Sequence, residues 1–259
     1  MTEQKVKLSA ATLNLLKECP RCFYLSLKKN LRRPAGPMPS IATGLDSLVT
    51  RYFHYYRQKG EVPPMIREKV AGHLASEEFF DLQKGIKAKW LIYEDKQFPF
   101  VLIGKLDDCI VEKDGYSPLD YKTRASLPRE IHQSFQLQMD IYTFLLSGNK
   151  GRKFPVTGRA YLLYFFPVEA TDVIEPENRE KILLPFQVEL KTLETKPESI
   201  PPLLHQAAEI LKGEQPPASS QCEYCRWAAE WSKDACPDAL SGKVEIQQEE
   251  EQHDRETLF

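Results

Sequence analysis

The 259-residue sequence lacks the features that would direct it into a membrane or along a secretory route. No apolar run approaches the roughly 20 residues that a membrane-spanning helix requires. The N-terminal stretch MTEQKVKLSA has no apolar segment of the kind found in secretory signals. These absences predict a soluble cytoplasmic protein.

Two motifs of well-defined chemistry are also missing. The sequence contains no Gly-x-x-x-x-Gly-Lys loop, so a nucleotide-driven motor is not expected in this chain. Its five histidines are scattered without His-x-x-x-His spacing, so we interpret them as ordinary residues. No internal repeat is present.

A strong excess of charge is lacking as well, since the net charge is only −2. The charge is uneven, because residues 244–259 hold six acidic residues and one basic residue, which leaves a net +3 on the rest. We interpret 244–259 as an acidic, disordered tail. A basic cluster consists of Lys28, Lys29, Arg32 and Arg33. It indicates phosphate contacts with a nucleic acid, and the alternative is a solvated helix end.

What is present predicts one α/β domain over residues 1–243, because 42% hydrophobic residues suffice for one sizeable core. Its expected parts are N-terminal helices within 8–60, an α/β core over 88–192, and a helix followed by a cysteine segment over 197–236. The expected elements are helices at 8–33 (Ser9 as N-cap, Pro20 a possible break), 41–59, 131–147 and 197–212, and strands at 89–93, 100–112, 116–123, 157–166 and 182–192.

A hairpin carries the residues best suited to chemistry. Asp114-Gly115 is a strong two-residue turn signal between the strands 100–112 and 116–123. With that turn, Asp107 pairs with Lys122. Side chains alternate along a strand, so Asp107, Asp120 and Lys122 are predicted to project from one face.

Two carboxylates and an ammonium on one face suit phosphodiester hydrolysis. Carboxylates about 7–8 Å apart at Cα can share one Mg²⁺ or Mn²⁺, and the lysine can act on the attacking water or the phosphate. Gly104 would permit a close approach of backbone. The alternative is a surface hairpin with an ordinary cross-strand Asp–Lys pair, and a one-residue slip would bring Asp108 forward instead of Asp107.

At this point the sequence resembles a known family. GKLDD (104–108) and LDYKT (119–123) are similar to the second and third motifs of the PD-(D/E)XK nucleases. The resemblance implies a restriction-endonuclease-like core, in which a mixed central β-sheet is flanked by helices. It also implies that Asp107 and Asp120 are metal ligands and that Lys122 is the catalytic lysine.

The helix after the hairpin extends the resemblance. Gln138 and Tyr142 are four residues apart, so they share one helix face. They resemble the Gln-x-x-x-Tyr motif of RecB-like nucleases, which is taken to engage DNA. The alternative is a core tyrosine beside an incidental glutamine; Gln136 has no tyrosine at this spacing.

The RecB-like pattern also implies a histidine four residues after a glycine on an earlier helix. Here Gly44 is followed by Leu48, so the histidine is missing. Asp46 is the best substitute as a third metal ligand, with His54 as a weaker one. Asp46 is equally compatible with a surface position.

Six cysteines in a chain without an export signal favour metal binding over disulfides. Cys19–Cys22 and Cys222–Cys225 are two Cys-x-x-Cys pairs that together could close a four-thiolate site. The alternative is a set of buried structural cysteines, which is our interpretation of Cys109.

The segment LSAATLNLLKECPRCFYL resembles the N-terminal signature of CRISPR-associated RecB-like exonucleases and AddB-type helicase-nucleases. That resemblance implies a [4Fe–4S] cluster held by Cys19, Cys222, Cys225 and Cys236. The ten residues between Cys225 and Cys236 are longer than the usual spacing, and Cys22 competes for the fourth position. A ligand set that uses Cys22 in place of Cys236, and so consists of the two Cys-x-x-Cys pairs, favours zinc.

The resemblance therefore implies a Mg²⁺- or Mn²⁺-dependent deoxyribonuclease, in particular an exonuclease on single-stranded DNA in repair, recombination or defence. A helicase or defence-complex protein is the implied partner. The alternatives are a catalytically inactive nucleic-acid-binding module and a scaffold subunit of a larger complex.

Overall fold

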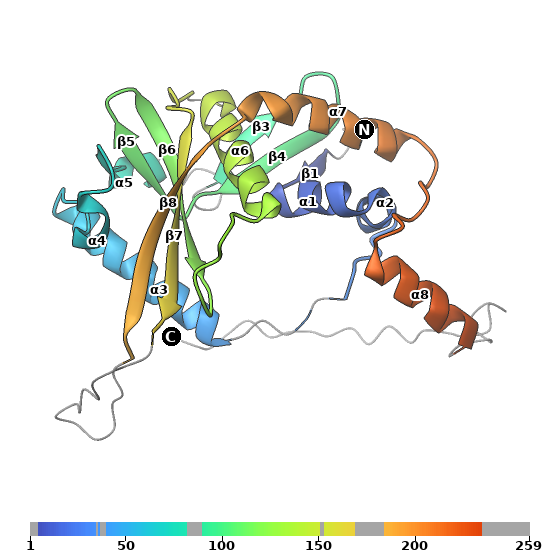
Figure 1. Cartoon of the computed structure of the whole chain (residues 1–259). Coiled ribbons are helices and arrows are strands. Elements are labelled where there is room, and N and C mark those ends of the chain that lie inside the picture. Colours follow the sequence, from blue (N-terminus) through green and yellow to red (C-terminus); the bar gives the residue numbers. More distant parts are fainter. Residues whose placement is uncertain are drawn as a thin grey trace, which may run out of the picture. The chain divides into compact units, whose positions relative to one another are not determined.

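The computed structural model describes residues 5–34, 36, 40–81, 90–150, 153–168 and 184–234 (Figure 1). The chain divides into two compact units, Met1–Pro217 and Ala218–Phe259. The tail 244–259 lies outside the described residues. Among the described helices, none combines the length and the apolar character needed to cross a membrane.

In chain order the elements are β1 (Val6–Leu8), α1 (Ala10–Glu18), α2 (Pro20–Lys28), α3 (Ser40–Gln58), α4 (Pro64–Arg67), β2 (His73–Leu74), α5 (Glu77–Asp81), β3 (Trp90–Glu94), β4 (Phe100–Lys105), β5 (Asp108–Glu112), β6 (Gly115–Thr123), α6 (Gln133–Gly148), β7 (Arg159–Pro167), β8 (Phe186–Glu194), the 3-10 turn η1 (Pro197–Ser199), α7 (Ile200–Lys212) and α8 (Glu223–Asp234). As the sequence predicts, N-terminal helices are followed by a run of strands, a helix and further strands, and the short strands β1 and β2 are additions to that pattern.

The predicted helix 8–33 is two helices. Ser9 caps α1 as predicted, and it forms a capping box in which its backbone N–H donates to Thr12 Oγ1 at 2.7 Å. Pro20 begins α2, because proline lacks the N–H that a helix interior needs and its fixed φ suits the first turn.

The strands form two mixed sheets. One has the order β1-β4-β3, and the other has the order β2-β5-β6-β7-β8. The pairs β1–β4 and β6–β7 are parallel, and the remaining pairs are antiparallel. The mixed α/β class is therefore confirmed. The predicted strand 100–112 is wrong as one strand, because β4 and β5 belong to different sheets and meet at Leu106 and Asp107.

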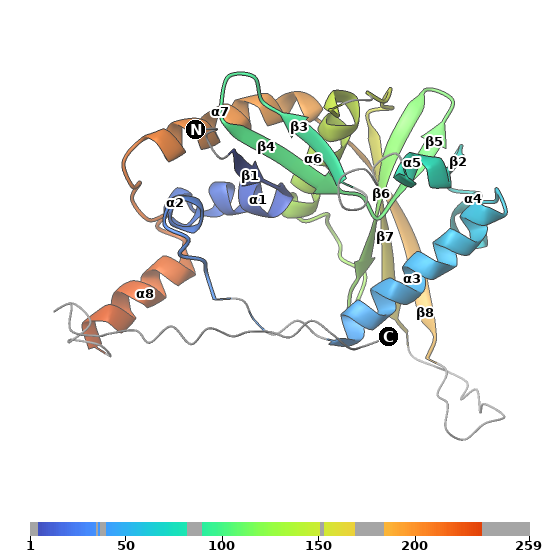
Figure 2. The same cartoon turned by 180° about the vertical axis from the view of Figure 1, so that it is seen from behind.

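Helices cover both faces of the five-stranded sheet. On one face α3 packs Phe53 and Val49 against a cluster that includes Tyr121 of β6 (Figure 2). On the other face α6 packs Leu137 and Met139 into the larger core cluster. Alternate residues of β6 therefore face different helices.

The hairpin register differs from the predicted one. Glu112 pairs with Gly115, so the turn residues are Lys113 and Asp114 instead of Asp114 and Gly115. Gly115 has a φ of +145°, and a Cβ there would lie 2.7 Å from the carbonyl oxygen of Pro155. Gly115 thus permits the backbone of Pro155 to lie close to the hairpin. The turn signal in the sequence does not reveal this contact, because Pro155 is distant in sequence.

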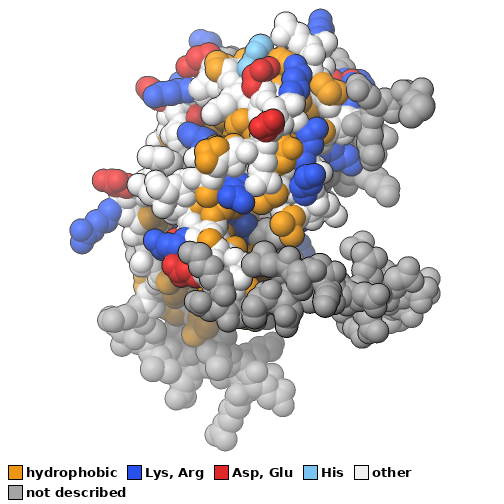
Figure 3. Space-filling view, turned by 90° about the vertical axis from the view of Figure 1, so that its right-hand side faces the viewer, with side chains coloured by type: hydrophobic (Ala, Val, Ile, Leu, Met, Phe, Trp, Pro, Cys, Tyr) orange, Lys and Arg blue, Asp and Glu red, His pale blue; other side chains and the backbone are white. Residues whose placement is uncertain are grey.

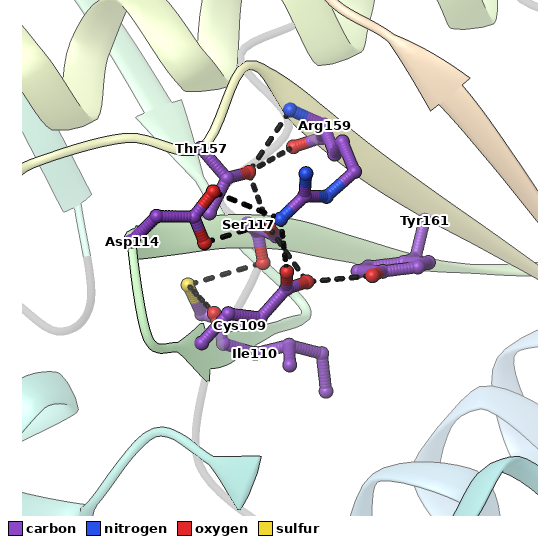
Figure 4. Close-up of polar contacts among 8 residues, drawn as sticks. Cys109, Ile110, Asp114, Ser117, Thr157, Arg159 and Tyr161 are labelled. Atoms are coloured by element: carbon purple, nitrogen blue, oxygen red, sulfur yellow. Dashed lines mark hydrogen bonds and ion pairs between the residues drawn. The ribbon is translucent and has the colours of Figure 1, made fainter. Parts of the chain in front are cut away.

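A buried polar network fixes the turn end of this hairpin to β7 (Figure 4). Glu112 accepts hydrogen bonds from Tyr161 at 2.6 Å and Ser117 at 3.2 Å, and it forms an ion pair with Arg159. The Arg159 guanidinium also contacts Asp114 at 3.1 Å. Because the hairpin is held at its turn, its open end lies at a defined place beside β7 and α6.

Candidate active site

The two predicted acidic ligands lie side by side at the open end of the hairpin. Asp107 occupies the link between β4 and β5, and its Oδ2 accepts a hydrogen bond from the backbone N–H of Tyr121 at 3.0 Å. That N–H adjoins Asp120, which lies in β6 and is 2% exposed. The observed strand pairing differs from the predicted pairing by two residues. A shift of two residues keeps each side chain on the same face of the sheet, so Asp107 and Asp120 still lie on one face as predicted.

Their electrostatics support a shared site. Burial, followed by the charge of Asp120, raises the pKa of Asp107 from its ordinary 3.8 to about 7. Burial also raises the pKa of Asp120, against the lowering effect of Lys122. The charge of Asp46 acts to raise both pKa values. The structure therefore brings three acids within electrostatic range of one another, which is unfavourable without a cation.

Lys122 and Gln138 complete a network around Asp120. Lys122 forms an ion pair with Asp120 Oδ2 and donates to Gln138 Oε1 at 3.0 Å. The Gln138 amide nitrogen donates to Asp120 Oδ1 at 3.0 Å and to the Tyr142 hydroxyl at 2.9 Å. Gln138 thus bridges Asp120, Lys122 and Tyr142. The resemblance links the Gln138–Tyr142 motif to DNA contact, whereas these hydrogen bonds suit Gln138 to orienting the acid and the lysine.

Gly104 explains how α6 reaches this site. A Cβ on Gly104 would lie 2.5 Å from Leu145 Cδ1 and 3.1 Å from the ring of Tyr142. The predicted close approach is therefore made by α6, which lies directly on β4. The helix can then place Gln138 over the end of the hairpin.

Asp108 does not take the place of Asp107. It is 1% exposed, receives a hydrogen bond of 2.8 Å from the Tyr121 hydroxyl and forms an ion pair with Arg57 of α3. Its pKa is raised, chiefly by burial, while Arg57 opposes that rise. Asp108 therefore anchors α3 to the sheet, on the side away from Gln138.

The two candidates for the missing histidine behave differently. Asp46 is an exposed residue of α3 whose charge reaches Asp107 and Asp120. His54 instead contacts Glu77 at 2.8 Å and Gln58 at 3.0 Å. These contacts favour Asp46 as the third acid.

The donor set fits a hard divalent cation. Asp120 Oδ2 is buried, and the Lys122 ammonium lies against it as an ion-pair partner. Carboxylate oxygens such as those of Asp120, Asp107 and Asp46 are the ligands that Mg²⁺ prefers, and a cation would relieve the repulsion between these acids.

Comparison with known proteins agrees with this geometry. A family model described as the PD-(D/E)XK nuclease superfamily matches residues 45–229. That range includes Asp46 and the residues of the network described above, which are Asp107, Asp120, Lys122, Gln138 and Tyr142. The chain belongs to the PD-(D/E)XK nuclease superfamily. Members of this superfamily are nucleases that use divalent metals. The mixed sheets flanked by helices are consistent with its restriction-endonuclease-like fold.

More distant comparisons add little. A crystal structure described as SSO0001 is similar at 13% identity with a TM-score of 0.38, covering 88% of this chain and 87% of that chain. No curated protein matches the chain. The PD-(D/E)XK assignment therefore rests on the family model.

The cysteines outside the nuclease network form two local pairs. Cys19 is the N-cap of α2 and Cys22 lies in its first turn; both are buried. Cys222 directly precedes α8, and Cys225 lies in the first turn of that helix. These four cysteines could hold a metal ion. Cys236 lies outside the described residues.

Cys109 is set apart from these pairs. Its side chain is fully buried in the hairpin, and its Sγ donates to the carbonyl oxygen of Ser117 at 3.3 Å. The interpretation of Cys109 as a structural cysteine agrees with this position. None of the five described cysteines forms a disulfide.

The predicted basic cluster lies at the end of α2. Lys28, Lys29 and Arg32 are exposed, whereas Arg33 forms an ion pair of 2.6 Å with Glu18. On the face shown in Figure 3, Lys and Arg side chains are scattered among apolar and neutral ones in the part of the chain that the structure describes. A role of this cluster in phosphate contacts stays a prediction.

Proposed function

We propose that the chain is a RecB-like, Mg²⁺- or Mn²⁺-dependent deoxyribonuclease. The observation that carries this proposal is the Gln138 bridge, because one side chain joins the acid, lysine and tyrosine motifs of a nuclease site. The order and spacing of these motifs resemble RecB-like nucleases. This network has no evident purpose in a purely structural hairpin.

Each residue has a defined task in this proposal. Asp107, Asp120 and Asp46 would hold the cation, which would stabilise charge on the phosphate and make an attacking water more acidic. Lys122 holds its ammonium at the edge of this site through Gln138 and Asp120. There it can offset developing negative charge on the phosphate or orient the water.

The substrate we propose is single-stranded DNA, cleaved from an end. Support comes from the resemblance to RecB-like exonucleases in repair, recombination and defence, and to AddB-type helicase-nucleases. The sequence has no phosphate-binding loop of its own, so a helicase or a defence-complex protein is the proposed partner.

We also propose that the cysteine pairs bind one metal centre. The chemistry of the donors supports this, since four thiols in two Cys-x-x-Cys pairs suit zinc or an iron–sulfur cluster. Three of them, Cys19, Cys22 and Cys222, are buried. The resemblance to CRISPR-associated exonucleases favours [4Fe–4S], with Cys236 as a competing ligand, whereas the symmetric set with Cys22 favours zinc.

One observation favours a second function, nucleic-acid binding without cleavage. Leu48 stands at the place of the usual histidine, and its side chain is 55% exposed. The site then depends on Asp46 for its third acid. A chain that has lost metal affinity in this way would keep the fold and bind nucleic acid as a module or scaffold.

Cleavage of end-labelled single-stranded DNA with Mg²⁺ or Mn²⁺ separates the two functions. We expect the wild type to cleave, and Asp120→Ala and Lys122→Ala to abolish cleavage. Lys113→Ala is the matched control, because Lys113 is an exposed lysine at the turn of the same hairpin. A metal-replete wild type that cleaves neither single- nor double-stranded DNA would refute the nuclease proposal.

A further inference from the structure

A cavity of about 610 Å³ lies along the loop between β6 and α6. Its lining runs from Arg124 to Gln133 and includes Glu130 and His132 as further ionisable residues. The volume falls in the range of pockets that bind small ligands, roughly 300–1,000 Å³. A nucleotide-sized group therefore fits.

The cavity adjoins the catalytic lysine through one aromatic ring. The Arg124 guanidinium lies 5.0 Å from the ring centroid of Phe135, and the Lys122 ammonium lies 4.5 Å from it. Both cations are therefore held by the same ring of α6. A strand whose cleaved phosphate is next to Lys122 would bring a neighbouring phosphate to Arg124.

Contacts from other elements hold the loop in place. The backbone N–H of Arg124 donates to Phe165 of β7 at 3.0 Å, and the Lys191 ammonium donates to the carbonyl oxygen of Pro128 at 2.8 Å. The His132 side chain accepts from the Ser134 N–H at 3.2 Å and caps α6. The cavity is therefore preformed, which lowers the entropic cost of binding.

We propose that this cavity binds the phosphate adjacent to the one that is cleaved, with Arg124 as its counter-ion. This assignment rests on the proposed nuclease function. Glu130 is the acid of the lining, so it opposes the bound phosphate and limits affinity. Arg124 and Glu130 therefore have opposite effects on the same ligand.

The test is the affinity for fluorescein-labelled oligo(dT), measured by anisotropy in an Asp120→Asn background so that the probe stays intact. We expect Arg124→Ala to weaken binding on the order of tenfold and to reduce the salt slope by about 1. Glu130→Gln should tighten binding. Arg129→Ala is the matched control, because Arg129 is an exposed arginine of the same loop outside the lining, and its effect should stay within about twofold.

Equal losses of affinity in Arg124→Ala and Arg129→Ala would overturn the cavity as a phosphate site. That outcome is independent of the nuclease proposal, which is decided by cleavage with the wild-type chain.

Discussion

Gln138 shows how much depends on a single uncharged side chain. Its amide oxygen and nitrogen contact Lys122, Asp120 and Tyr142 with three hydrogen bonds. Groups that orient metal ligands in this way commonly account for a large part of activity, although they do not touch the metal themselves. In the proposed nuclease, Gln138 is therefore a positioning residue.

Replacing Gln138 by leucine should lower the cleavage rate by about 10- to 100-fold, because Lys122 and Asp120 lose their common partner. The measurement is kcat with single-stranded DNA, together with the Mn²⁺ concentration needed for half-maximal rate, which should rise. Gln136→Ala is the control, since Gln136 lies on the same helix but bonds Asp140 and the Glu194 carbonyl oxygen at 2.9 Å. Equal losses in both variants would assign Gln138 a merely structural role.

Asp107 should make stability depend on pH and metal together. Its folded pKa is raised to about 7, so the folded state binds this proton more tightly than the unfolded state. Without metal, the free energy of unfolding should therefore fall as pH rises from about 4 to about 7. A bound cation replaces the proton and removes this penalty.

Melting temperatures with and without Mn²⁺ test this linkage. The stabilisation by Mn²⁺ should be larger at pH near 8 than at pH near 5, and Asp107→Asn should remove most of the difference. A metal effect that is the same at both pH values in the wild type would contradict the placement of Asp107 in the cation site.

At the scale of elements, the hairpin shows which predictions survive an error. The turn was predicted one residue from its observed position, which shifts each pairing by two residues, yet Asp107, Asp120 and Lys122 still meet at one site. Side chains in a strand alternate with period two, so a shift of two residues moves pairs along the strand and keeps their face. The motif residues were therefore predictable although the register was not.

What the sequence could not predict depends on contacts between distant segments. The register is set by the approach of Pro155 to Gly115, and the role of Asp108 is set by Arg57, which is 51 residues away. The parallel strand β1 is only three residues long, too short for a pattern of its own.

Gly104 and Gly44 give a matched pair of substitutions at this scale. Gly104→Ala should lower the free energy of unfolding by about 1–3 kcal/mol, because its Cβ would meet Leu145 and Tyr142 of α6. Gly44 lies in α3 with nothing within 4 Å of an added Cβ, so Gly44→Ala should raise stability by up to about 1 kcal/mol. Denaturant unfolding of both variants provides the measurement.

Cleavage activity provides a second test of the Gly104→Ala and Gly44→Ala variants. Cleavage should fall in Gly104→Ala, since α6 carries Gln138 and Tyr142, and it should be retained in Gly44→Ala. If Gly104→Ala were as stable and active as the wild type, α6 would not depend on this close approach.

At the scale of the whole chain, the two Cys-x-x-Cys pairs lie about 200 residues apart in sequence and belong to different units. A metal centre that uses both pairs would add a link between segments that are distant in sequence, and closing so long a loop constrains the unfolded chain strongly. The family match covers residues 45–229, so Cys222 and Cys225 lie within it and Cys19 and Cys22 lie before it.

Metal content and stability test this link, with Cys22→Ser compared against Cys109→Ser. The wild type should be purified with zinc or with iron and sulfide, and Cys22→Ser should lose most of that metal and melt at a lower temperature. Cys109→Ser should keep the metal, because Cys109 is buried in the hairpin, where its Sγ contacts the carbonyl oxygen of Ser117. A brown protein with a broad visible absorbance would identify the iron–sulfur form, whereas a colourless zinc protein would identify the other. If Cys22→Ser retained full metal while Cys236→Ser lost it, the fourth ligand would be Cys236.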